Sequence, residues 1–297
     1  MQGGSLLVVR NVLLGLVLFL LGIMPASYAQ EDNENNAIGP VEKIVSFSSG
    51  LAGISLGGYW GYIDAFGKIV IKPIFREVGL FSANYAPARV DEKWGYINRK
   101  GLFVINPTFD QARPFSGGLA PVRKQNLWGV INTNGKVVHD YSFDDLKSFG
   151  QGLAPAKRLG KWGFINTEGK FVIKRAWLDA GEFSEGLAPV ENLENHWGYI
   201  NTDGRTTIEY QFDDAGEFSE GLAPVRVESK WGYVNRKGKY RINPEYEQAK
   251  CFSEKLAAVK KDGKWGYINS KGKDVIPFTF EKADEFSSGR ALVETDE

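Results

Sequence analysis

Seven Trp-Gly pairs recur along this chain of 297 residues at an almost constant spacing. Successive pairs are separated by 34, 34, 34, 35, 34 and 34 residues. A fixed period in this range is typical of a tandem repeat in which one supersecondary unit is copied and stacked, so the fold depends on what one unit forms. The pairs begin at Trp60, Trp94, Trp128, Trp162, Trp197, Trp231 and Trp265.

One unit, taken from residue 218 to residue 251, contains three candidate strands. The first covers Leu222–Val227, the second Trp231–Asn235 and the third Tyr240–Ile242. The second strand shows the period of two that a β-strand requires, and apolar side chains occur on both of its faces. We therefore predict an all-β fold of tandem ~34-residue repeats, each a three-stranded meander, with sheets packed on both sides.

The turn between the second and third strands has the best defined sequence. Each copy has Asn or Asp four residues after its Trp and Gly seven residues after it, as in Asn201–Gly204. Only glycine takes a positive φ without a steric cost, so this pattern predicts a type I turn that ends in a left-handed residue. A proline follows in four copies and predicts the end of the third strand, because it removes a hydrogen-bond donor from the ladder. These prolines are Pro73, Pro107, Pro244 and Pro277.

Two short motifs resemble the WG (or KWG) repeat family of bacterial proteins. Lys-Trp-Gly-Tyr-Ile-Asn occurs at 93–98 and 264–269, and Phe-Ser-Glu-Gly-Leu-Ala-Pro-Val occurs at 183–190 and 218–225. The resemblance spans roughly residues 47–297. It implies a β-repeat architecture that binds or scaffolds other molecules, and it brings no catalytic residues to this chain. Departures from the pattern at proline positions are Gly53, Ala258, Tyr141, Arg175 and Tyr210.

Stacked meanders of this kind form either a closed propeller or an open superhelical β-solenoid. In a propeller each meander is a blade, with the Leu-Ala-Pro-Val strand innermost and the third strand outermost. Seven full copies lie within the range of about 4–8 blades that propellers use, which favours the propeller. A partial eighth copy at 286–293 has a first strand only. It either caps an open array or pairs with the segment Val41–Phe47 to close a ring.

Residues 1–29 have the pattern of a secretory signal peptide. Arg10 precedes an uncharged apolar run at 12–24, and Ser27 and Ala29 are the small residues that signal peptidase requires. Cleavage is therefore predicted after Ala29, which makes the protein exported, either periplasmic or extracellular. The alternative is an uncleaved N-terminal membrane anchor, although the run is short against the ~20 residues that cross a bilayer.

The segment at 30–40 is polar and acidic, and it predicts a disordered linker because it has little apolar surface with which to offset the entropy of ordering. The repeat array then covers 41–297. Without residues 1–29 the chain carries 35 basic and 36 acidic side chains, spread evenly through the repeats. Binding to nucleic acid requires a local basic excess, so nucleic acid is not an expected partner. We expect a monomer with no stable membrane insertion after signal cleavage.

No set of residues predicts catalysis, a cofactor or a bound metal. His139 and His196, the only histidines, lie in different units at unrelated positions. Cys251 is the only cysteine, so no disulfide forms within the chain. It stands where sister copies have glutamate, as at Glu182 and Glu217, and is interpreted as a neutral replacement rather than a reactive thiol. The expected protein is not an enzyme.

The array breaks its own spacing at one place, in the connection between the first and second strands of the fifth unit. This connection is one residue longer than its sisters, and Trp177, the one Trp outside the Trp-Gly series, lies one unit-step earlier. Insertions in repeat proteins map to loops on one face, often the binding face. The predicted binding surface contains Trp177, Glu191, Asn192, Glu194 and His196.

The neighbouring connections at 123–127 and 158–161 border this surface. The alternative is a neutral insertion in an exposed hairpin. Taken together, the sequence predicts an exported, non-enzymatic binding or scaffold module of the cell envelope that recognises a protein or a glycan. Two other functions remain open, an envelope hydrolase that uses the repeat array as a frame and a structural spacer.

Overall fold

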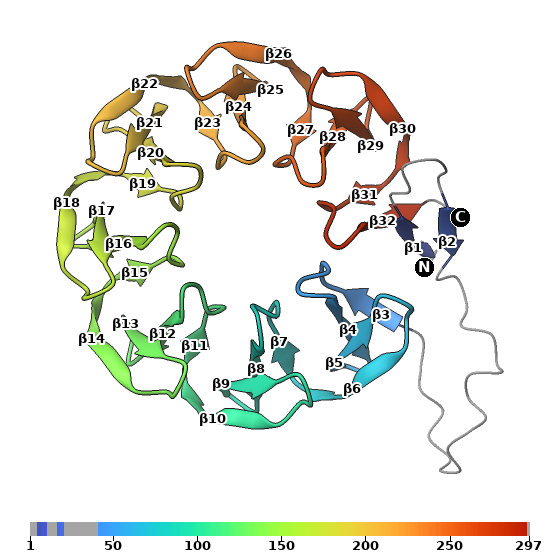
Figure 1. Cartoon of the computed structure of the whole chain (residues 1–297), viewed down its shortest axis with the longest axis vertical. Coiled ribbons are helices and arrows are strands. Elements are labelled where there is room, and N and C mark those ends of the chain that lie inside the picture. Colours follow the sequence, from blue (N-terminus) through green and yellow to red (C-terminus); the bar gives the residue numbers. More distant parts are fainter. Residues whose placement is uncertain (1–4, 11–16, 21–40, 296–297) are drawn as a thin grey trace.

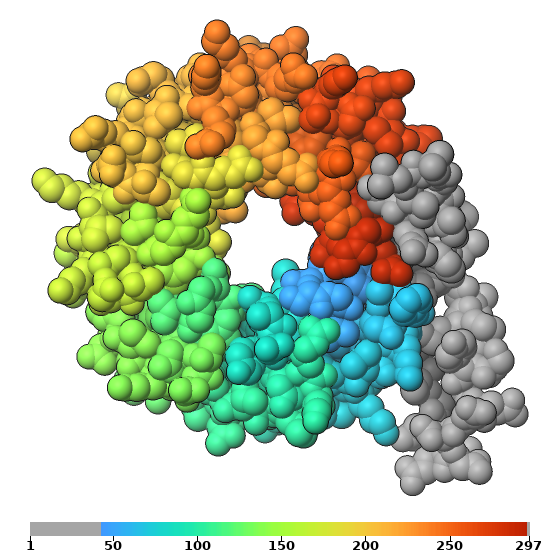
Figure 2. Space-filling view, in the orientation of Figure 1, coloured from blue at the N-terminus to red at the C-terminus, as the bar shows by residue number. Residues whose placement is uncertain are grey.

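The computed structural model describes residues 5–10, 17–20 and 41–295. These residues form eight four-stranded sheets, arranged as blades around a central opening (Figures 1 and 2). Seven of these blades each contain one Trp-Gly pair. The fold is therefore a closed β-propeller rather than an open superhelical solenoid, and no helix occurs among the described residues.

The blades are numbered in chain order, with the strands of each given from the opening outward (Figure 1). Blade 1 contains β3 (Val41–Ile44), β4 (Leu51–Leu56), β5 (Tyr59–Asp64) and β6 (Ile69–Phe75). Blade 2 contains β7 (Glu77–Val78), β8 (Tyr85–Val90), β9 (Lys93–Asn98) and β10 (Phe103–Phe109). Blade 3 contains β11 (Gln111–Ala112), β12 (Leu119–Lys124), β13 (Leu127–Asn132) and β14 (Val137–Phe143). Blade 4 contains β15 (Asp145–Leu146), β16 (Leu153–Arg158), β17 (Lys161–Asn166) and β18 (Phe171–Trp177).

Blade 5 contains β19 (Asp179–Ala180), β20 (Leu187–Glu191), β21 (Trp197–Asn201) and β22 (Thr206–Phe212). Blade 6 contains β23 (Asp214–Ala215), β24 (Leu222–Val227), β25 (Lys230–Asn235) and β26 (Tyr240–Tyr246). Blade 7 contains β27 (Gln248–Ala249), β28 (Leu256–Lys261), β29 (Lys264–Asn269) and β30 (Asp274–Phe280). Blade 8 combines the two ends of the chain as β31 (Lys282–Ala283), β32 (Arg290–Thr295), β1 (Ser5–Arg10) and β2 (Val17–Leu20).

Each repeat unit contributes a fourth strand that the predicted three-stranded meander lacks. In blade 4 this strand is β15, which pairs with β16 through Asp145↔Lys157 and Leu146↔Ala156. The Leu-Ala-Pro-Val strand is therefore second from the opening, and the prediction that it is innermost is wrong. Two residues are too few to show an alternating pattern, so the sequence of this strand is indistinguishable from that of an acidic loop.

The outer strand continues past the proline that the sequence predicts as its end. β26 passes through Pro244 to Tyr246, and Tyr246 pairs with Trp231 after a register shift. The outermost strand of a blade has no neighbour on one side, so the missing N–H of a proline leaves no ladder partner unpaired. The extension places an aromatic ring opposite the Trp of the Trp-Gly pair.

The glycine of the Trp-Gly pair lets the outer strand cross close to the middle strand. A Cβ on Gly232 would lie 2.6 Å from the carbonyl oxygen of Ile242 and 2.6 Å from the nitrogen of Pro244. These are backbone atoms of the neighbouring strand and cannot rotate away. Glycine is therefore required at this position by sterics, independently of its φ angle.

The indole rings of the Trp-Gly pairs pack within the blades, and those of Trp128, Trp162 and Trp265 lie beneath cations from the inner loops. Trp128, Trp162 and Trp265 are buried, and the other four are half-buried. The Arg113 guanidinium lies 4.6 Å from the ring centroid of Trp128 and forms an ion pair of 2.9 Å with Asp145 of the next blade. One cation thus covers a ring in its own blade and links that blade to its neighbour.

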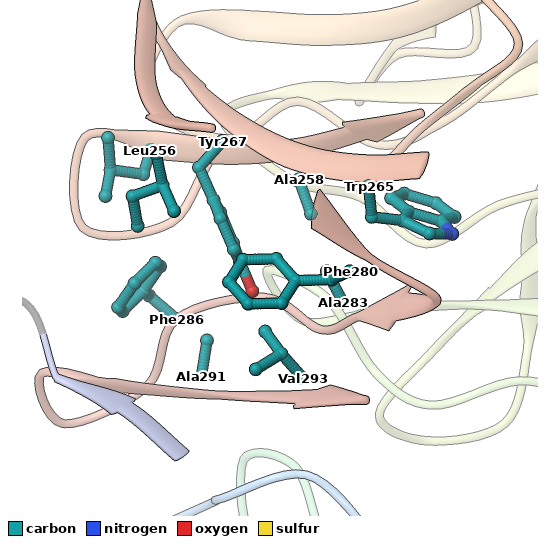
Figure 3. Close-up of a cluster of buried hydrophobic side chains, with 10 residues drawn as sticks. Leu256, Ala258, Trp265, Tyr267, Phe280, Ala283, Phe286, Ala291 and Val293 are labelled. Atoms are coloured by element: carbon teal, nitrogen blue, oxygen red, sulfur yellow. The ribbon is translucent and has the colours of Figure 1, made fainter. Parts of the chain in front are cut away.

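Apolar cores lie between neighbouring blades, which explains why a single unit is not an independent fold. Figure 3 shows the cluster between blades 7 and 8, where Tyr267 and Phe286 pack with ring centroids 5.0 Å apart. The Tyr267 hydroxyl donates a 2.8 Å hydrogen bond to the carbonyl oxygen of Asp284 in blade 8. A buried hydroxyl needs such a partner, so this contact fixes the spacing of adjacent blades.

The ring closes by packing between blades 8 and 1, and a strand of the N-terminal segment joins the sheet of blade 8. β32 pairs with β1, whereas Val41–Ile44 pairs with β4 inside blade 1. The alternative in which Val41–Phe47 pairs with the final copy is therefore wrong. Leu292 instead packs into the core of blade 1 against residues such as Ile54.

The predicted cleavage site after Ala29 and the predicted linker at 30–40 lie outside the described residues. Two parts of the predicted signal peptide, Ser5–Arg10 and Val17–Leu20, are described and form β1 and β2. In the described part of the chain, no helix has the length and apolar character needed to cross a membrane.

Candidate functional site

The antiparallel order of the strands divides the loops between two faces of the ring. One face carries the tight connections between the second and third strands of each blade, and we call it the hairpin face. The other carries the Asn-Gly turns and the Phe-Ser turns, and we call it the glycine-turn face. On the hairpin face, the connections of blades 1 to 7 lie at 57–58, 91–92, 125–126, 159–160, 192–196, 228–229 and 262–263.

Three consecutive blades present a leucine on the hairpin face. Leu127 of blade 3 is 38% exposed, Leu159 of blade 4 is 82% exposed and Leu193 of blade 5 is 61% exposed. The hairpin turns of the other four repeats are polar or glycine-rich, as in Asp91-Glu92. Tyr59 is the counterpart of Leu127 in blade 1, and its ring is covered by Arg76 at 4.6 Å. The exposed leucines therefore make blades 3 to 5 chemically different from the rest of this face.

The lengthened connection of blade 5 is a well-ordered turn. The Asn192 side-chain oxygen accepts hydrogen bonds from the backbone N–H groups of Glu194, at 2.9 Å, and His196, at 3.0 Å. Asn195 takes a left-handed conformation with φ of 61°. The same pattern occurs in the turn that starts at Asn201, whose side-chain oxygen accepts from residues two and four positions later. Glu194 and His196 are exposed on this turn.

The extra turn replaces a hydrogen bond that the hairpins of blades 3, 4 and 7 receive from a carboxylate outside the hairpin. The Asp110 carboxylate accepts from the backbone N–H of Gln125 at 2.7 Å, and Asp144 accepts from that of Gly160 at 3.3 Å. The corresponding residue in blade 5 is Leu178, which has no acceptor in its side chain. The turn of blade 5 is capped by its own Asn192 instead. The inserted turn therefore satisfies its own backbone N–H groups, and it holds Leu193 at the surface.

Glu191 ends β20 in a half-buried position opposite Asp179. Burial raises the pKa of the Glu191 carboxyl, and the charges of Asp179 and Asp214 raise it further. Asp179 is itself paired with Lys147 of blade 4 at 3.0 Å. Glu191 therefore lies at the base of the hairpin, among the contacts between blades.

Trp177 lies in the core rather than on the predicted surface. Its side chain is 8% exposed, and its indole N–H donates a 2.9 Å hydrogen bond to the Tyr210 hydroxyl. The ring packs edge-on against Phe164 with centroids 6.0 Å apart. Its position is the one that Phe143 and Phe212 occupy at the ends of their outer strands. Of the five predicted surface residues, the structure brings Glu191, Asn192, Glu194 and His196 together at one hairpin. The Trp177 ring is buried, although the next residue, Leu178, donates its backbone N–H to the carbonyl oxygen of Glu191.

Sequence reasoning missed the three leucines. Leu127 and Leu159 fall within the bordering connections and Leu193 within the insertion, so all three lie in segments that the sequence analysis had assigned to the surface. The usable signal is a large apolar residue in or beside a hairpin turn of two to five residues, where exposure is unavoidable.

Residues with chemical reactivity have packing roles. The Cys251 thiol contacts the carbonyl oxygen of Glu217 at 3.5 Å, and burial, together with the charges of Glu285 and Glu217, raises its pKa to about 12. The thiol therefore stays protonated at neutral pH. His139 packs edge-on against Phe143 at 4.8 Å, in the strand position that holds isoleucine in sister blades.

Two other features are accounted for by the fold. Residues 53–57 spell the Gly-x-Ser-x-Gly pattern of a nucleophile elbow, but Ser55 lies inside β4 and is 3% exposed, without the strand-turn-helix context that the motif requires. In the described part of the chain, no three His, Cys, Asp or Glu side chains are grouped to hold a metal ion.

A cleft of about 290 Å³ lies between blades 3 and 4 on the glycine-turn face. Its Ser116 and Gln151 side chains are engaged in hydrogen bonds between blades.

Comparison with solved structures shows the propeller fold at low sequence identity. The computationally designed Ika8 protein is similar with a TM-score of 0.60 and 10% identity, covering 87% of this chain and 96% of that chain. BamB from Moraxella catarrhalis is similar with a TM-score of 0.57 and 12% identity, covering 85% and 96%. A eukaryotic initiation factor is similar with a TM-score of 0.59 and 12% identity, covering 95% and 87%. Identities this low show a shared fold alone.

Sequence comparison identifies the repeat directly. No curated protein matches the chain. The family described as WG containing repeat matches seven consecutive segments, at residues 60–94, 94–128, 128–162, 162–194, 197–231, 231–265 and 265–297. These matches are in register with the Trp-Gly strands of blades 1 to 7 and cover most of the array, so the chain belongs to the WG containing repeat family.

Proposed function

We propose that this protein is an exported, non-enzymatic binding or scaffold module of the cell envelope, and that it recognises a protein through the hairpin face of blades 3 to 5. The observation that carries the proposal is the row of exposed leucines, Leu127, Leu159 and Leu193, on three consecutive blades. Exposed apolar groups that gather on one part of a surface are typical of protein interaction sites.

A protein partner is favoured over a glycan by the placement of the aromatic rings. Sugar recognition by stacking needs an exposed ring face, whereas Trp128, Trp162 and Trp177 of this region are all buried. Around the leucines, charges of both signs are present, including Arg158 and Glu194. An apolar centre with a mixed polar rim is the composition of many protein interfaces.

Export is part of the same proposal and rests on Arg10, the apolar run and the small residues Ser27 and Ala29. N-terminal sequencing of the protein from its native host is the direct measurement. A mature chain that begins at Gln30 supports export with cleavage. Recovery of the intact N-terminus in the membrane fraction supports the anchored alternative.

The binding proposal is tested by site-specific photo-crosslinking in cells. A photoreactive amino acid at position 159 or 193 is expected to trap the same partner protein, identified by mass spectrometry. Position 102 is the matched control, because Leu102 is as exposed as Leu193, at 61%, but lies on the glycine-turn face of blade 2. Loss of the adduct from position 159 in a variant that also carries Leu127→Ser and Leu193→Ser and stays folded is the expected confirmation. Equal labelling from position 102 would remove the basis for this surface.

A further inference from the structure

The eighth blade is assembled from both ends of the chain. Its two inner strands, β31 and β32, come from the C-terminal end, and its two outer strands, β1 and β2, come from the first twenty residues. β1 runs antiparallel to β32, with partners from Ser5↔Thr295 to Arg10↔Arg290. Figure 1 shows β1 and β2 beside β32 at the outer side of this blade.

In the seven repeat blades, the place of β1 is taken by a Trp-Gly strand. In blade 7, for example, β28 is paired by β27 on one side and by β29 on the other. Leu256↔Asn269 and Lys260↔Trp265 define that register. The corresponding positions on β32 face Arg10 and Leu6, so β1 occupies the register of a Trp-Gly strand without having its sequence.

Signal cleavage would remove both β1 and β2. β32 would then become the outermost strand of a two-stranded blade, with backbone N–H and C=O groups unpaired along one edge. This strand cannot simply unfold, because Leu292 packs in the core of blade 1 and Val293 in the core shared with blade 7. Closure of the ring therefore holds an open strand edge in place.

We propose that, in the exported protein, the edge of β32 is a strand-acceptor site that binds an extended apolar segment of a partner protein in antiparallel orientation. This inference rests on the proposed export, since only processing uncovers the edge. The class of ligand follows from the occupant of the site before processing, whose sequence from Leu6 to Val9 is entirely apolar. Main-chain hydrogen bonds supply affinity in such β-augmentation, and side-chain pockets supply specificity.

The test uses the processed protein, purified after export with its N-terminus at Gln30 verified. The probe is a synthetic peptide with the sequence of Ser5–Arg10, flanked by lysines for solubility. Its binding is expected to slow backbone hydrogen exchange at residues 290–295 and to leave the polar hairpin of blade 6 unchanged. A peptide in which Val8 is replaced by proline is the matched control, because proline removes a ladder donor.

An uncleaved variant provides the second control. Ala29→Arg is expected to block signal peptidase, so that β1 remains attached and covers the edge. A tethered strand competes at an effective concentration in the millimolar range, so the variant is expected to bind the peptide roughly 100-fold more weakly than the processed protein.

The outcomes separate this inference from the export proposal. An unprocessed native chain overturns both, because β1 then closes the blade permanently. A processed chain whose β32 amides exchange at the same rate with and without peptide overturns the acceptor site alone. Equal protection by the peptide and by its proline variant also overturns it. Concentration-dependent dimers without peptide, with protection at the same residues, would assign the edge to a second copy of the chain and reject a foreign partner.

Discussion

The Ser46 hydroxyl donates a 2.7 Å hydrogen bond to the Asp284 carboxylate, joining two residues that lie 238 positions apart in the sequence. The other oxygen of Asp284 is paired with Lys250 of blade 7. One carboxylate thus links blade 7 to the loop of blade 1 across the junction where the ring closes. Closure of this propeller depends on such contacts because blades 8 and 1 are not joined by a repeat connection.

Ser46→Ala tests the closing contact. It leaves the Asp284–Lys250 pair in place and removes one hydrogen bond to a charged group, which is expected to cost about 1–2 kcal/mol of unfolding free energy. Hydrogen exchange is expected to accelerate in blades 1 and 8 together. Ser229→Ala in the exposed hairpin of blade 6 is the control, expected to change stability by less than ~0.5 kcal/mol. Faster exchange in blade 8 alone would mean that the ring does not close through this contact.

Trp162→Ala tests the packing of the Trp-Gly rings. The side chain is buried, so its removal is expected to cost about 3–5 kcal/mol, whereas Lys271→Ala in an exposed turn should cost less than ~0.5 kcal/mol. Chemical denaturation measures both. Small and equal effects would show that the indole rings contribute little to the core.

Gly232→Ala tests the close approach of the outer strand. The new Cβ would collide with backbone atoms of Ile242 and Pro244, so the expected cost is about 1–3 kcal/mol or more. Gly263→Asn is the matched control, because no atom lies within 4 Å of its added Cβ and asparagine tolerates a positive φ. A larger loss at Gly263 than at Gly232 would contradict the steric explanation.

Cys251 predicts a specific dependence of stability on pH. Its folded pKa of about 12 lies above the ordinary value of 9.0, so the fold favours the neutral thiol. This contribution is fully present below pH 9.0 and is lost as the pH rises toward 12, where the unfolded thiol ionises first. The unfolding free energy of the wild type should therefore fall more steeply above pH 9.0 than that of Cys251→Ala. Parallel curves for the two proteins would contradict burial of the thiol.

The sequence predicted the repeat, the family and the propeller because Trp and Gly recur for separate steric reasons. The ring fills the blade, and the glycine at positions such as Gly232 admits a crossing strand. It did not predict the inner strands, since two residues such as Asp145–Leu146 show no periodicity. The sequence also did not predict blade 8. Its strand β1 pairs with a strand at the opposite end of the chain, and the sequence of β1 has the pattern of a signal peptide.

The candidate surface was predicted in part. The spacing between Trp-Gly pairs alone located the insertion at Glu191–His196, because one interval is a residue longer than the others and this is visible without any structure. Trp177 was assigned to the surface because it lies one unit-step before the insertion. Its position also matches the aromatic residues Phe109, Phe212 and Tyr246 of sister units, and the structure buries it as it buries them. In blade 5 the outside cap position is held by Leu178 and the turn is capped by Asn192. These two residues lie in different connections of the chain, and only the structure brings them to one hairpin.

The replacement of an outside cap by Asn192 gives the sharpest test of the hairpin. Replacing Glu191–His196 with the five-residue segment Arg226–Lys230 restores the short connection of blade 6 but leaves it without a cap, because Leu178 has no acceptor. The swap alone is expected to cost about 1 kcal/mol, and adding Leu178→Asp should recover most of that loss, giving a coupling energy of about 0.5–1 kcal/mol in a double-mutant cycle. Leu178→Asp in the native chain is the control and should not stabilise, because Asn192 already accepts the turn N–H groups. Additive effects of the two changes would contradict this replacement of the outside cap. If the swapped, stable protein still gives the partner adduct from a photoreactive amino acid at position 159, the insertion is a neutral variation that binding does not need.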